Sequence, residues 1–211
     1  DTYPELSLAT QSFYAGGVSD SLREPYDFVI RDIDIEVPAR KAPGSGHQAF
    51  VHTAKLVVVK SDDQKDDLEN QVCLVRKPGM VVEAIQKSYP GVTYHAVLLA
   101  GEAAWRAGAT VPEEDRLADM FLRAAEPPSH DRWIPRANSK SPTQLSSSYI
   151  APWVANLQEI QRRVNAELDE LFASLSPSTD GKRPAGILDR LKFLRKGEGG
   201  QVARKAMPRV L

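Results

Sequence analysis

Cysteine and long apolar runs are scarce in this chain, and each shortage excludes a class of protein. Cys73 is the single cysteine among 211 residues, so no internal disulfide can form and no cysteine-based zinc site can be built. No apolar segment approaches the roughly 20 residues that cross a bilayer, and the first residues lack a basic stretch followed by an apolar one. We therefore predict a cytoplasmic protein without a membrane segment.

The sequence also lacks the common signatures of nucleotide binding and catalysis. Neither GxxxxGK[ST] nor a GxGxxG after a strand is present, and "GGVSDSL" does not match the GxSxG elbow of serine hydrolases. The four histidines, His47, His52, His95 and His130, are dispersed, and no two have the spacing of helical metal ligands. We predict no catalytic residue, metal or cofactor in this chain.

Both ends of the chain suggest a piece of a longer polypeptide. It begins with Asp1, before which an initiator methionine is not normally removed, and it stops on the apolar pair Val210-Leu211. The function is then expected to belong to a larger parent protein.

Charge is distributed unevenly along the chain. Residues 181–211 carry nine basic and two acidic side chains, a net charge of +7, which leaves −8 for residues 1–180. A basic end can contact phosphate backbones, and a solvated tail or a contact with the chain's own acidic body are equally common explanations. The candidate nucleic-acid contacts are Lys182, Arg183, Arg190, Lys192, Arg195 and Lys196.

The hydrophobic pattern predicts five strands followed by helices. Strand patterns cover residues 26–38, 49–60, 71–76, 80–87 and 92–101. A slip in the alternation between Ile30 and Ile33 predicts a β-bulge, and Pro78-Gly79 predicts a tight type II turn between the third and fourth strands. Strands that precede helices indicate an α+β fold with a mostly antiparallel sheet.

Three helices are expected after the sheet. Residues 112–126 place Leu117, Met120, Phe121, Ala124 and Ala125 on one face, and a short final helix spans 187–197. The longest pattern, 149–175, repeats apolar residues at Ile150, Val154, Leu157, Val164, Leu168, Leu171 and Leu175. Its apolar stripe would be covered by the sheet or by a second copy in a homodimer.

These patterns divide the chain into four parts. We predict an N-terminal arm (1–24), an α+β domain (25–135), a linker with the long helix (136–176) and a basic C-terminal segment (177–211).

Two short clusters are candidate sites. His130, Asp131, Arg132 and Trp133 follow two prolines that stop a helix, and neighbouring side chains in an extended chain point to opposite sides. We therefore favour a structural corner, with Trp133 buried, over an acid/base site. Arg76 and Lys77 are expected at the tip of a hairpin, where they would present cations to phosphate or carboxylate.

Three segments, "VCLVRKPGMVV", "YHAVLLAGEAA" and "FLRAAEPPSHDRW", together resemble one known region. It lies downstream of the ATPase domain in a group of bacterial, often actinobacterial, ATP-binding proteins of the GHKL class, which includes gyrase B, MutL and heat-shock chaperones. The resemblance covers residues 26–135, and its most specific part is 125–133.

The resemblance implies a non-catalytic transducer or regulatory module of a multidomain ATP-binding protein. The helix-borne Glu/Asn pair and the DxGxG segment of the class are missing, so Mg-ATP and the N-terminal ATPase domain would belong to the parent. In that class a loop lysine of the transducer reaches the γ-phosphate, and Arg76 or Lys77 are the candidates for it here. The alternatives are a nucleic-acid-binding module and, less favoured, a hydrolase built on His95, His130 and Asp131.

Overall fold

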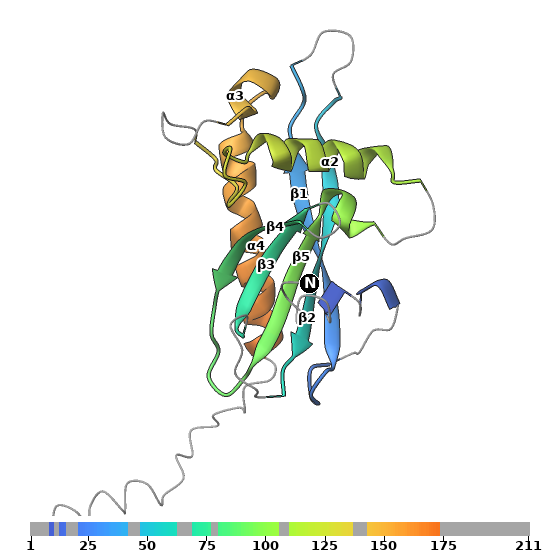
Figure 1. Cartoon of the computed structure of the whole chain (residues 1–211), viewed down its shortest axis with the longest axis vertical. Helices are drawn as coiled ribbons and strands as arrows, with labels where there is room; N and C mark the ends of the chain where they lie inside the picture. Colours follow the sequence, from blue (N-terminus) through green and yellow to red (C-terminus); the bar gives the residue numbers. More distant parts are fainter. Residues whose placement is uncertain are drawn as a thin grey trace, which may run out of the picture. The chain divides into compact units, whose positions relative to one another are not determined.

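Five strands lie side by side and form one mixed sheet (Figure 1). The computed structural model describes residues 9–10, 13–15, 21–41, 47–62, 69–76, 80–105, 110–136 and 143–173. The strands are β1 (Phe28–Val37), β2 (Phe50–Lys60), β3 (Gln71–Arg76), β4 (Met80–Gln86) and β5 (Tyr94–Ala100). Their order is β1-β2-β5-β3-β4, and the β3–β5 pair alone is parallel. The predicted α+β fold with a mostly antiparallel sheet is confirmed.

The central strands are apolar on both faces because both faces are covered. Leu56 and Leu98 belong to one core cluster, whereas Val57, Val97 and Leu99 belong to a second cluster on the other face. Ala9 and Phe13, from the N-terminal part of the chain, lie in this second cluster. Two covered faces explain why β2 and β5 read as continuous apolar runs rather than as strict alternation.

The bulge predicted in β1 is wrong. β1 pairs with β2 without interruption from Phe28–Val59 to Val37–Phe50. The slip in the pattern arises because Phe28 and Ile30 pack against the second cluster, while Ile33 faces the first. An irregularity lies instead between β3 and β4, where the register shifts after Leu74.

Helices cover one face and one end of the sheet. The short η1 (Gly101–Ala104) follows β5, α2 (Glu113–Ala124) crosses the end of the sheet, and α4 (Trp153–Ala173) runs along a face (Figure 1). A single turn, α3 (Leu145–Ser148), precedes α4. The buried side of α4 consists of Asn156, Leu157, Ile160, Val164, Leu168, Leu171 and Phe172. Its apolar stripe is thus covered by the chain's own sheet, with which it shares a core cluster.

Two details of the predicted helices differ from the structure. Ile150 precedes α4 and is 51% exposed, so it does not belong to the helical stripe. In α2 the buried residues are Ala118, Asp119, Phe121, Leu122 and Ala124, while Met120 is exposed. The helix is turned about one residue from the predicted face because it lies across the sheet end and buries a carboxylate there.

The part of the chain that the structure describes contains no helix long and apolar enough to span a membrane. All the described residues belong to one compact unit. The predicted final helix, Leu175 and the Pro78-Gly79 turn lie outside the described residues.

Candidate functional site

A buried guanidinium marks the end of β3, directly before the β3–β4 turn. Arg76 is 3% exposed and makes a two-pronged contact with Glu126: Nη2 donates to Oε2 at 2.8 Å and Nε donates to Oε1. Its Nη1 lies 3.5 Å from Asp119 Oδ2 on α2. Such paired hydrogen bonds to a carboxylate are strong and demand a fixed geometry. Arg76, Asp119 and Glu126, with His130, are called the Arg76 cluster below.

The chain after α2 places Glu126 and His130 in this cluster. The amides of Ala125 and Glu126 bond back to Leu122 and Arg123, and Pro127 then prevents further helix. His130 has a positive φ of 52°, and its amide donates to the carbonyl of Pro127 at 3.0 Å. This turn brings His130 Nδ1 to 2.7 Å from Glu126 Oε2. One carboxylate therefore joins a buried arginine to a half-exposed histidine.

Charge in the cluster is held by mutual hydrogen bonding. Burial alone would raise the pKa of Glu126, but hydrogen bonds from Arg76 and His130 and the charge of Arg76 outweigh it and lower that pKa. The hydrogen bond to Glu126 raises the pKa of Arg76, against the effect of burial. Both groups are therefore ionised at neutral pH, as a buried pair requires.

A second polar contact ties α2 to the same end of the sheet. The Gly101 amide donates to His52 Nε2 at 2.9 Å, and His52 Nδ1 lies 3.3 Å from Asp115 Oδ1. Burial and then the nearby Lys55 charge lower the pKa of His52 to about 4. The imidazole is neutral at pH 7, and because Nε2 accepts a hydrogen bond, Nδ1 carries the proton on the side that faces Asp115.

The four residues of the predicted corner lie in different surroundings. Trp133 is 8% exposed and belongs to the core, as expected. Asp131 and Arg132 are exposed and contact each other, and Asp131 also accepts from Ser129 Oγ at 2.9 Å. His130 is half exposed and bonds to Glu126 rather than to Asp131. The corner thus anchors a chain turn and leaves one imidazole facing outward.

The hairpin tip differs from the prediction. β3 and β4 do pair as a hairpin, but Arg76 is buried in the ion cluster instead of being presented at the tip. The reason is that two carboxylates reach the end of β3, that of Asp119 on α2 and that of Glu126 shortly after α2. Lys77 lies outside the described residues, as do all six basic candidates for nucleic-acid contact from Lys182 to Lys196.

The described residues bring none of the hydrolase candidates together. His95 is in β5 opposite Val59 and Gln71, while His130 and Asp131 follow α2. Neither of two pockets in the described part of the chain is lined by His95, His130 or Asp131. No group of three or more metal-binding side chains occurs among the described residues.

Sequence reasoning missed Asp119 and Glu126. A signal existed for Asp119, because the carboxylate stands among the apolar positions Ala118, Phe121 and Leu122 of a helix, and a buried carboxylate needs a cation. Glu126 gave none, since a glutamate before two prolines is ordinary at a helix end. Nothing local pairs it with Arg76, fifty residues earlier.

Comparison of the chain with protein-family models, with curated proteins and with solved structures gave no match.

Proposed function

We propose that this chain is a non-catalytic transducer module of a larger GHKL-type ATP-binding protein. In this proposal Lys77 contacts the γ-phosphate of Mg-ATP held by the parent's N-terminal ATPase domain, and the Arg76 cluster passes the nucleotide state on to α2. Cys73 is a buried free thiol, which suits a parent that works in the reducing cytoplasm. A homodimer of the parent belongs to the same proposal.

The Arg76 cluster is the observation that carries this proposal. Arg76 is joined by a peptide bond to Lys77, and its guanidinium is fixed by carboxylates of α2 and of the corner that follows α2. A displacement at the turn is therefore costly unless Asp119 and Glu126 move with it, because a buried charge cannot lose its partner cheaply. The ion cluster would thus convert a shift of the turn into a shift of α2 and His130.

The first test is ATP hydrolysis by the full-length parent. Lys77→Ala should lower kcat by about tenfold or more, because it removes a cation from the developing charge on the γ-phosphate. Lys65→Ala is the matched control, since residue 65 precedes β3 in the sequence whereas Lys77 follows it. Its kcat should equal that of the unchanged protein.

The second test asks whether nucleotide binding reaches the corner. In a parent in which Trp105 and Trp153 are changed to Phe, the fluorescence of Trp133 should change when a non-hydrolysable ATP analogue is added. Glu126→Gln should reduce that change while leaving nucleotide affinity in place. The proposal is contradicted if Lys77→Ala leaves kcat unchanged and the fluorescence of Trp133 does not change when the ATP analogue is added.

A further inference from the structure

The open edge of β1 and the helix beside it form a surface that the transducer role does not use. We infer that this surface, the β1–α4 seam between residues 32–38 and 156–167, binds an extended basic peptide that joins the sheet as an additional strand next to β1. This inference does not depend on the proposed transducer function.

β1 offers unpaired backbone on one side. It is an edge strand, and among the described strands it pairs with β2 alone. Asp27 O accepts from the Lys60 amide at 2.9 Å on the β2 side, whereas Glu36 O accepts from Asn156 Nδ2 at 2.9 Å on the other. Backbone groups of alternate residues in an antiparallel pair point to opposite sides. Asp32 and Asp34 therefore direct both their N–H and C=O groups away from β2.

Side chains close the two ends of this edge. Arg31 donates from its guanidinium to Ile30 O at 3.2 Å, and Asn156 occupies Glu36 O at the other end. Between these caps Asp32 and Asp34 line a hollow of about 350 Å³ against α4. An incoming strand would find its hydrogen-bond partners in this middle stretch.

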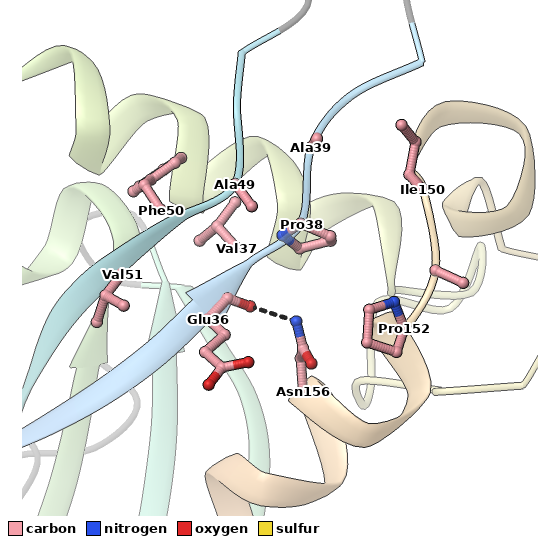
Figure 2. A pocket seen from close by; sticks show the side chains of 11 residues that line it. Glu36, Val37, Pro38, Ala39, Ala49, Phe50, Val51, Ile150, Pro152 and Asn156 are labelled. Atoms are coloured by element: carbon pink, nitrogen blue, oxygen red, sulfur yellow. Dashed lines mark hydrogen bonds between the residues drawn. The ribbon is translucent and has the colours of Figure 1, made fainter.

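An apolar pocket of about 380 Å³ lies at the far end of the same seam. Figure 2 shows Phe50 and Val51 from β2 on one side, Ile150 and Pro152 from the segment before α4 on the other, and Pro38 between them. Val51 and Ile150 are more than half exposed. The pocket suits one bulky apolar side chain at one end of a bound peptide.

The charge of the seam favours a basic partner. Five carboxylates line the two hollows, those of Asp32, Asp34, Glu36, Glu159 and Glu167, against the two guanidinium groups of Arg162 and Arg163. Both guanidinium groups are already engaged by Glu159, through hydrogen bonds of 2.6 Å from Arg162 Nε and 3.0 Å from Arg163 Nε. Lys55 of β2 pairs with Asp32 at 2.7 Å. The negative charge that remains available to lysine or arginine side chains of a ligand is therefore that of Glu36, Glu167 and Asp34, which Arg163 approaches only to 4.0 Å.

The same charges argue against a second copy of this chain as the occupant. Pairing β1 with another β1 would place Asp32, Asp34 and Glu36 of one copy along the same residues of the other, and like charges across strands are destabilising. A peptide along residues 32–37 needs about six residues, at roughly 3.3 Å each. The favoured ligand is thus a short strand with alternate basic residues and one apolar end.

Binding can be tested with the whole 211-residue chain and a fluorescein-labelled hexapeptide library. The library has lysine or arginine at alternate positions and valine, leucine or phenylalanine at either end. We expect saturable binding by fluorescence anisotropy that weakens with salt. In the best binder, N-methylation of residues whose amides face β1 should weaken binding roughly fivefold each, and methylation of the residues between them should not.

Two pairs of variants locate the site. Glu36→Lys should weaken binding about two- to fivefold, with Glu170→Lys, an exposed α4 position outside the seam, as the control. Ile150→Asp should remove the preference for an apolar end, and Met120→Asp, a similarly exposed apolar position on α2, should not. Far-ultraviolet circular dichroism checks that all four variants are folded.

Three results would overturn the inference. The first is a library without a saturable binder, and the second is binding that N-methylation weakens equally at every position. The third is sedimentation showing that a second copy of the chain, rather than peptide, occupies the edge.

Discussion

His52 shows at the residue scale how burial fixes the charge of a side chain. It is 2% exposed, it accepts from the Gly101 amide, and its pKa lies near 4 because of burial and then Lys55. In the unfolded chain the pKa returns to about 6.5. Folding therefore has to exclude a proton from this imidazole whenever the pH lies between these two values.

This difference predicts a loss of stability in acid. Since the unfolded state binds the additional proton, the contribution of His52 is complete above pH 6.5, falls as the pH decreases and levels off below about 4. The whole effect amounts to roughly 3 kcal/mol. Between pH 7 and pH 4.5 the free energy of unfolding in urea should therefore fall by more in the unchanged protein than in His52→Gln. A constant difference would contradict the assignment.

Arg76 shows why single residues were harder to predict than strands. Its place at the end of a strand was visible in the sequence, and a cation beside a turn is usually solvated. Its actual surroundings depend on Asp119 and Glu126, which reach it only after the sheet and α2 have formed. Trp133 was predictable, because a large aromatic side chain after a helix stop usually enters the core.

At the scale of elements, the position of α2 depends on Gly101. This glycine has a φ of +58°, and a Cβ placed on it would lie 2.8 Å from Cα and Cβ of Asp119. The start of η1 therefore approaches the backbone of α2 so closely that position 101 has room for a hydrogen atom but not for a Cβ. The contact holds Asp119 next to Arg76.

Gly101→Ala should consequently displace α2 and destabilise the protein. Gly91→Ala is the matched control, because Gly91 also has a positive φ, of 73°, but nothing within 4 Å of an added Cβ. Both substitutions bear the conformational cost of about 1–2 kcal/mol, and Gly101→Ala should cost a further 1–3 kcal/mol, roughly, for the clash. Thermal unfolding of the two variants measures the difference, and equal midpoints would contradict the close contact.

Most elements were predictable because their signals are local. Period-two alternation and turn residues located all five strands, and the apolar spacing located α2 and α4. The β1 bulge and the face of α2 were wrong because both depend on what covers an element. Phe28 and Ile30 break the alternation of apolar and polar residues only if the second face of the sheet is assumed to be exposed to solvent.

At the scale of the whole molecule, β5 is the centre of the sheet, with β2 on one side and β3 on the other. Amides in β5 should therefore exchange with solvent most slowly in native-state hydrogen exchange, and those in the edge strands β1 and β4 faster. Mass spectrometry of peptides covering Tyr94–Ala100 and Phe28–Val37 provides the comparison. Faster exchange in β5 than in β1 would contradict the strand order.

The strand order was beyond sequence reasoning, although the α+β class was not. The class follows from the succession of strands and helices along the chain. The order requires β5 to pair with β2, as in Val57 opposite Val97, across the intervening β3–β4 hairpin. Apolar strands of similar composition offer no local information that distinguishes this partner from another.

The central place of the last strand has a consequence for biosynthesis. A ribosome delivers β1–β2 and β3–β4 first, as two hairpins whose inner edges, β2 and β3, have no partner until Tyr94–Ala100 emerges. Exposed apolar edges attract other chains. During translation the nascent polypeptide is thus most vulnerable to aggregation just before its fifth strand appears. A pause or truncation at that point would leave two hairpins with exposed apolar edges at β2 and β3.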